Sequence, residues 1–205
     1  ILNDFFFFLW FIYGIMAVGV LFTILTKFVQ VRRIKDMFVL MFKGNKSEKG
    51  ISSFQALSIA LSGRVGTGNI AGTATAIAMG GPGAVFWMWL IAFIGSATAY
   101  VESTLAQIYK EEKETEYRGG PAFYIEKGMG QKWFAVIFAV AALLAMLVLM
   151  PGVQSNAIAG AMNNAFEIEN WITGAIIAVL LGVIIIGGVR WIANAAQVIV
   201  PFMAL

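Results

Sequence analysis

The sequence predicts an all-α polytopic membrane protein, and three observations carry that prediction. Hydrophobic residues make up 60% of the 205 residues, and charged residues make up only 12%. Several uncharged runs reach about 18 residues or more, which is the length that a helix needs to cross the hydrocarbon core. The charged residues gather between these runs. A soluble domain carries about twice this share of charge, so we expect a single transmembrane domain.

Six membrane spans are predicted along this one domain. They cover residues 5–26, 51–79, 84–109, 133–162, 171–189 and 191–205. The last span stops after 15 residues, which is about 23 Å of helix and too short to cross a bilayer. The sequence therefore predicts that the protein continues beyond residue 205.

The polar segments predict an orientation in the cell membrane. Residues 27–50 carry seven basic and two acidic residues, which places this loop in the cytoplasm and the N-terminus outside. Within the loop, residues 31–42 form either a short surface helix or a simple solvated segment. Residues 110–132 are a second polar loop with balanced charge, in which residues 122–127 are predicted to form one or two helical turns.

Composition excludes several function classes. The chain has no cysteine and no histidine, so disulfides, thiol chemistry and histidine-based metal sites are excluded. Its basic residues flank membrane spans, which does not suggest nucleic acid. No nucleophile–base pair or metal-ligand cluster points to an enzyme. The lipid bilayer is the one macromolecular environment that the sequence indicates, and no protein partner is predicted.

The second span contains the most informative segment, residues 61–72. Its four glycines, at positions 63, 66, 68 and 72, each cost a helix roughly 1 kcal/mol relative to alanine. We therefore expect the helix to break near residues 66–69. Unwound backbone at this depth offers carbonyls to Na⁺ and amides to a carboxylate. Broken helices of this kind form the substrate sites of secondary transporters.

A structural alternative fits the same glycines. Gly68 and Gly72 form a G-x-x-x-G pair, which also serves close packing between membrane helices. Thr67 and Asn69 favour a binding site, because packing alone needs no amide there. Arg64 is an ionisable group at membrane depth. We expect it to pair with a carbonyl or carboxylate of the protein rather than with substrate.

Two further spans carry polar candidates. Pro151 is expected to kink the fourth span. Gln154 beyond it can face the cavity at the break, or it can cap a helix end. Asn156 lies about 200° from Gln154 on a regular helix, so both reach one ligand only if the backbone is distorted. Glu102, at the end of the third span, is expected to be interfacial and not ion-binding.

Separated motifs resemble one transporter family. The motif at residues 80–95, Gly-Gly-Pro-Gly-Ala-Val-Phe-Trp-Met-Trp-Leu-Ile-Ala-Phe-Ile-Gly, looks like the signature of the alanine or glycine:cation symporter family. Four other segments resemble that family in the same order, namely those starting at Val65, Arg118, Val153 and Val200. The resemblance covers about residues 50–205.

This resemblance implies a LeuT-type inverted-repeat transporter, in which two five-helix repeats face each other. The first span would be a peripheral helix, and the rest of the chain would cover most of the first repeat. The second repeat lies outside the sequence and would supply part of the site. Residues 1–205 alone are therefore not expected to transport.

The resemblance also implies a ligand and a site. The substrate would be a small neutral amino acid, alanine or glycine, with Na⁺ as the coupling ion. Na⁺ would lie near Gly66, Thr67 and Asn69, and Gln154 would contact the substrate. The residues expected to bind substrate are Gly66, Thr67, Gly68, Asn69, Gln154 and Asn156.

The mechanism expected is alternating access, driven by the Na⁺ gradient and the membrane potential. Proton coupling in place of Na⁺ remains open, as do the choice between alanine and glycine and the D/L selectivity. A channel is a weaker alternative, because a pore needs repeated rings of charges or carbonyls.

Overall fold

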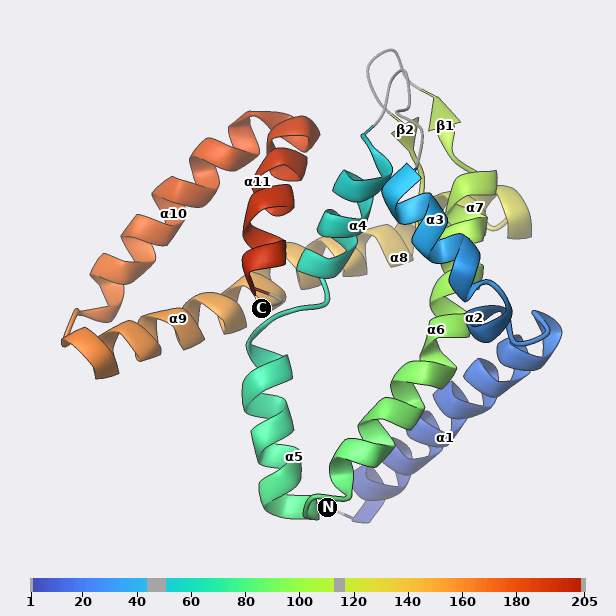
Figure 1. Cartoon of the computed structure of the whole chain (residues 1–205), viewed down its shortest axis with the longest axis horizontal. Coiled ribbons are helices and arrows are strands. Elements are labelled where there is room, and N and C mark those ends of the chain that lie inside the picture. The colour runs from blue at the N-terminus through green and yellow to red at the C-terminus, as the bar shows by residue number, and fades with distance from the viewer. Residues whose placement is uncertain (1, 44–50, 113–116, 204–205) are drawn as a thin grey trace. The chain divides into compact units, whose positions relative to one another are not determined.

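The structure is a computed structural model that describes residues 2–43, 51–112 and 117–203. It is almost entirely helical (Figure 1). Its contacts divide the chain into two units, which are described separately: residues 1–40 with 74–135, and residues 41–73 with 136–205.

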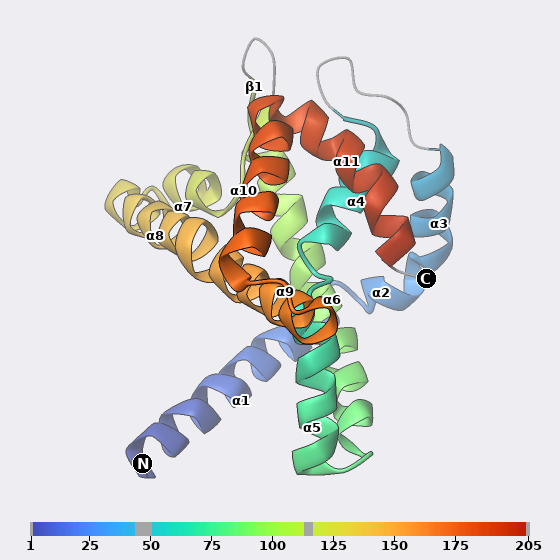
Figure 2. The same ribbon diagram turned by 90° about the vertical axis from the view of Figure 1, so that its left-hand side faces the viewer.

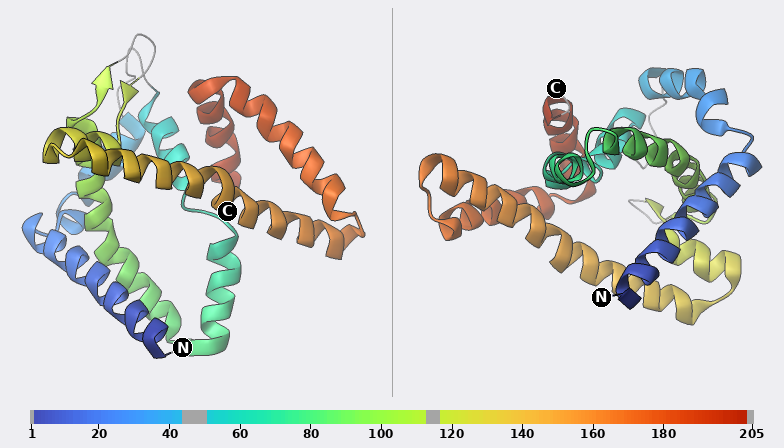
Figure 3. Two further views of the ribbon diagram at one scale, coloured as in Figure 1. Left: turned by 180° about the vertical axis from the view of Figure 1, so that it is seen from behind. Right: turned by 90° about the horizontal axis from the view of Figure 1, so that it is seen from below.

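The first unit is organised around α1 (Leu2–Leu25) and α6 (Ala84–Ile108), which lie side by side (Figures 1 and 3). Gly19 permits this approach, since a Cβ there would come within 2.5 Å of the Ile94 side chain. Ala97 of α6 is completely buried. A small residue of α1 thus lies where the two helices approach each other, as is common between membrane helices.

The first polar loop forms helices. The helical alternative for residues 31–42 is the one that the structure adopts, as α2 (Val29–Arg32) and α3 (Ile34–Lys43). Between them, Arg33 forms an exposed salt bridge of 2.6 Å with Asp36. This hydrogen bond raises the pKa of Arg33 above its usual value. The position of these helices on the membrane surface remains a prediction.

The second polar loop holds a hairpin that the sequence did not predict. Strands β1 (Glu111–Glu112) and β2 (Tyr117–Arg118) pair in antiparallel register. Two-residue strands are too short to show an alternating pattern. The predicted short helix is present as α7 (Pro121–Met129), and Lys127 forms a 2.8 Å salt bridge with Glu111.

In the second unit, α4 (Ser53–Ser62) packs along α11 (Gly188–Met203), as Figure 2 shows. Ser58 and Ala193 are almost completely buried in this contact region. Gln55 Nε2 also donates a 2.9 Å hydrogen bond to Asn194 Oδ1. The capping box of Ser52 and Gln55 fixes the start of α4. The α4 helix is therefore fastened to α11 by small residues and one pair of amides.

Replacing Ala193 with leucine should destabilise this contact. Ala193 is 0% exposed, so the larger side chain must displace a neighbour, at a cost of about 1–3 kcal/mol. We expect the thermal unfolding midpoint of the natural protein in detergent to fall by several degrees. Val198→Leu is the matched control, because Val198 is 72% exposed on the same helix. Equal midpoints for the two variants would contradict the packing described here.

The fourth predicted span is one long helical run from Lys132 to Phe166 (Figure 3). It consists of α8 (Lys132–Leu144), the π-helix η2 (Ala145–Leu149) and α9 (Met150–Phe166). The irregularity lies before Pro151 and not after it. The proline ring conflicts with the carbonyl four residues earlier, and the wider π turn lies at that place. The run also extends four residues beyond the predicted end at residue 162.

The helical run is followed by a turn and α10 (Asn170–Ile186), which packs back on α9 (Figure 3). Glu167 ends α9 in the left-handed conformation, with φ of 58°. In the described part of the chain, two helices are long and apolar enough to cross a membrane by themselves, Ala84–Ile108 and Lys132–Phe166. The first predicted span corresponds to the continuous helix α1, the second is interrupted, and the last two correspond to the shorter helices α10 and α11. The course of these segments through the bilayer remains a prediction.

Candidate functional site

The candidate site is the interruption between α4 and α5 (Thr73–Gly80). The α-helix ends at Ser62, with Gly63 as its C-cap, and backbone from there to Gly66 is not helical. The π-helix η1 (Gly68–Gly72) then leads into α5. The break predicted at residues 66–69 thus begins about three residues earlier. Gly63, which the prediction did not use as a helix end, is the reason.

Side-chain amides hold the middle of this break. Asn69 Oδ1 accepts a hydrogen bond of 3.1 Å from the N–H of Gly66. Gln154 Oε1 accepts one of 3.1 Å from the N–H of Thr67, across 87 residues of sequence. Both amide N–H groups would be unsatisfied in a bilayer without these acceptors. Gln154, on α9, therefore acts as an external cap for the broken helix.

Glycine at position 66 makes this contact with Gln154 possible without a shift of its side chain. A Cβ there would overlap the amide group of Gln154, whereas a Cβ at Gly68 or Gly72 would meet no described atom within 4 Å. The close-packing interpretation of the Gly68–Gly72 pair therefore has no partner in the described part of the chain. The glycine at position 66 has a specific steric role, and those at 68 and 72 do not show one.

At residues 63–65, the free backbone hydrogen-bonding groups are acceptors. The N–H groups of Gly63, Arg64 and Val65 all donate to carbonyls of α4. Among the described residues, no N–H or O–H donates to the carbonyl oxygens of the same three residues. A backbone with its donors occupied and its carbonyls free suits a cation, because hard cations bind oxygen ligands. The Na⁺ position predicted near residues 66, 67 and 69 is adjacent in sequence to these carbonyls and stays a prediction.

Arg64 has the structural role that the sequence favoured. Its Nη1 atom donates a 2.9 Å hydrogen bond to the carbonyl of Ala60, one turn back on α4. The guanidinium thus pairs with the C-terminal end of α4, where the helix dipole is negative.

The remaining predicted residues are less directly involved. The structure joins Gly66, Thr67, Asn69 and Gln154 by hydrogen bonds or contact. In the described part of the chain, no hydrogen bond links Asn156 to this group, as expected from its position on the opposite side of a regular helix. Thr73 was not predicted, and its Oγ1 atom donates 2.6 Å to the carbonyl of Asn69. Its i, i+4 spacing from Asn69 is the signal that could have identified it.

The polar cluster is incompletely covered. Gly66 and Thr67 are half-buried, and Asn69 and Gln154 are exposed. Polar groups at membrane depth need protein, water or ligand around them. The described residues therefore leave this polar cluster open on one side.

A glycine-rich interruption in an apolar helix, held by an amide from a neighbouring helix, is typical of membrane transport proteins. The arrangement therefore indicates a membrane transport protein. The chain belongs to the sodium:alanine symporter family, whose family model matches residues 1–205. The resemblance inferred from the motifs is confirmed, and the family is one of membrane transporters and not of enzymes.

Named relatives extend the comparison. The chain is 69% identical over 194 residues to the "Putative sodium/proton-dependent alanine carrier protein YrbD" of Bacillus subtilis, covering 95% of this chain and 40% of the relative. It is 50% identical over 169 residues to the "Sodium/proton-dependent alanine carrier protein" of Bacillus sp. (strain PS3), covering 82% and 38%. It is 47% identical over 193 residues to the "Probable sodium/glutamine symporter GlnT" of Bacillus subtilis, covering 93% and 40%. The chain thus spans about 40% of the length of these relatives.

Proposed function

We propose that this chain supplies one side of the substrate and cation site of a secondary active transporter that carries a small neutral amino acid together with Na⁺. The observation that supports this most directly is which backbone groups of the break are hydrogen-bonded and which are free. Its donors at residues 63–67 are occupied, and its carbonyls at residues 63–65 are free. This favours a cation at the break.

The substrate would lie against the residues that close the break. In this proposal, Gln154 and Asn69 present their second hydrogen-bonding groups, the Nε2 and Nδ2 amides, to the carboxylate of an amino acid. The backbone of residues 66–69 lines the same place. Gly68 and Asn156 remain candidate substrate residues from the motif resemblance, with no contact among the described residues that assigns them a role.

The architecture proposed is the LeuT-type inverted repeat, with the N-terminus outside and α1 as a peripheral helix. A second repeat from outside this chain would cover the exposed polar cluster. Transport would proceed by alternating access, with the membrane potential adding about 2.3 kcal/mol per charge per 100 mV.

Uptake by the natural protein that carries this sequence tests the proposal. In proteoliposomes, we expect labelled alanine to accumulate with an inward Na⁺ gradient and not with an equal choline gradient. Labelled glycine and glutamine should be compared in parallel, because one relative is named for glutamine and two for alanine. Accumulation that follows an imposed pH gradient without Na⁺ would replace Na⁺ by H⁺ as the coupling ion. Ion current without amino-acid dependence would support a channel instead.

A further inference from the structure

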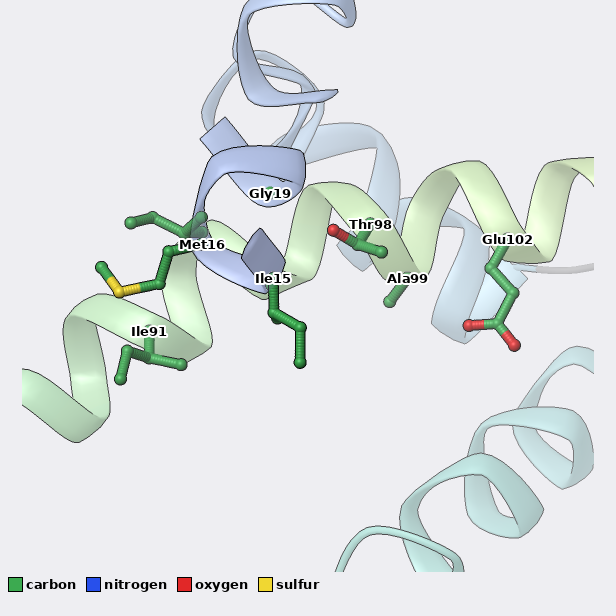
Figure 4. A pocket seen from close by; sticks show the side chains of 9 residues that line it. Ile15, Met16, Gly19, Ile91, Thr98, Ala99 and Glu102 are labelled. Carbon is green, nitrogen blue, oxygen red and sulfur yellow. The ribbon is translucent and has the colours of Figure 1, made fainter. Parts of the chain in front are cut away.

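A separate crevice lies in the first unit, between α1 and α6 (Figure 4). Its volume is about 240 Å³. Ile15 and Met16 line it from α1, and Ile91 and Ile94 line it from α6. This volume is smaller than the roughly 300–1,000 Å³ of typical small-molecule sites. A narrow apolar crevice between two membrane helices suits a single flexible chain better than a compact solute.

One end of the crevice is polar. Glu102 stands at the end opposite Ile91, with Thr98 one turn before it on the same helix (Figure 4). Residues 84–101 of α6 carry no charge, so Glu102 is the first charged group along this helix. A carboxylate beside apolar surface is costly unless it is paired or solvated. In the described part of the chain, no salt bridge to Glu102 is present.

Glu102 also influences Tyr124 on the neighbouring helix α7. Burial raises the pKa of Tyr124 above its usual value, and the negative charge of Glu102 raises it further. Both effects oppose ionisation of the phenol. The Glu102 side chain therefore lies close enough to α7 to act on Tyr124, and it lines the polar end of the crevice.

The crevice is polar at one end and apolar at the other, like a phospholipid with its headgroup and acyl chain. Ile91 and Glu102 are 11 positions apart, or about 16 Å along an α-helix. In the predicted orientation, Glu102 lies at the cytoplasmic interface and Ile91 lies deeper in the bilayer. Apolar surface therefore extends inward from a negatively charged group at headgroup depth. An acyl chain with a positively charged headgroup is complementary to that arrangement.

We propose that this crevice binds one acyl chain of a phosphatidylethanolamine from the cytoplasmic leaflet, with the lipid ammonium group paired to Glu102. The negative carboxylate selects the ammonium-bearing lipid and repels anionic lipids such as phosphatidylglycerol. Gly95 and Ala99 line the same crevice, where a larger side chain would occupy the space of the acyl chain. This inference rests on the membrane orientation given under the proposed function, and it depends on neither the coupling ion nor the substrate.

Native mass spectrometry of the natural protein, extracted from bilayers of equal phosphatidylethanolamine and phosphatidylglycerol, tests this proposal. We expect wild type to retain phosphatidylethanolamine over phosphatidylglycerol by roughly three- to fivefold, the ratio that a partly solvated ion pair supports. Glu102→Gln should bring this ratio near one. Gly95→Leu should remove most of the retained lipid of both kinds.

Two matched variants control for general effects. Glu126→Gln removes an exposed carboxylate from α7, and Gly14→Leu adds the same bulk to α1 at a position that does not line the crevice. Both should behave as wild type. Equal retention of the two lipids by wild type, or a preference that survives Glu102→Gln, would overturn the proposal. No retained lipid, together with a lower unfolding midpoint for Gly95→Leu, would also overturn it and indicate that a protein segment fills the crevice.

Discussion

Gly66→Ala should lower the kcat/KM of amino-acid uptake about tenfold or more, although it adds only one methyl group. The new Cβ overlaps the amide of Gln154, which is the flexible end of its side chain and can move away. Moving it breaks the 3.1 Å hydrogen bond from the N–H of Thr67. An amide N–H left without an acceptor costs about 1–3 kcal/mol, and 1.4 kcal/mol corresponds to tenfold.

A double-mutant cycle shows whether this contact is the cause. Gln154→Ala alone should reduce uptake by a similar factor, and adding Gly66→Ala to it should have little further effect, because the overlapping group is gone. Gly72→Ala is the steric control, since its Cβ meets no described atom within 4 Å. If the two losses simply multiply, Gly66 and Gln154 act independently and the proposed coupling is wrong.

Na⁺ should raise the thermal unfolding midpoint of the natural protein, and choline at the same ionic strength should not. A cation that binds the free carbonyls of residues 63–65 stabilises the folded state over the unfolded one. At 100 times its dissociation constant it contributes about 2.7 kcal/mol, which corresponds to a rise of several degrees. The measurement needs only a thermal scan in detergent and no transport assay.

The Asn69→Ala variant connects this stabilisation to the break. Asn69 Oδ1 accepts the N–H of Gly66, so its loss loosens the backbone that presents the carbonyls. We expect the variant to need several-fold more Na⁺ for the same rise. Thr73→Val is a partner test, because it removes the hydroxyl that binds the Asn69 carbonyl at 2.6 Å while keeping its shape. A midpoint that depends on pH and not on Na⁺ would contradict a sodium site and support proton coupling.

Local features of the structure could be predicted where the residue types of a short segment decide them. Glycine clusters destabilise helices wherever they occur, so an interruption within residues 61–72 followed from composition. Its exact start did not follow, because Gly63 could equally have stayed inside the helix. The displacement of the Pro151 irregularity to residues 145–149 likewise depended on where the helix could widen.

The sequence by itself determined that this chain is helical, that it is apolar enough for a membrane and that its second span is interrupted. Those properties depend on residue types and their spacing. Only the tertiary structure decided which groups meet: Gln154 with Thr67 across 87 residues, and Gln55 with Asn194 across 139 residues. It also decided that the backbone carbonyls of residues 63–65 are left free. Hydrogen bonds between distant segments depend on how helices pack, and no local pattern encodes that.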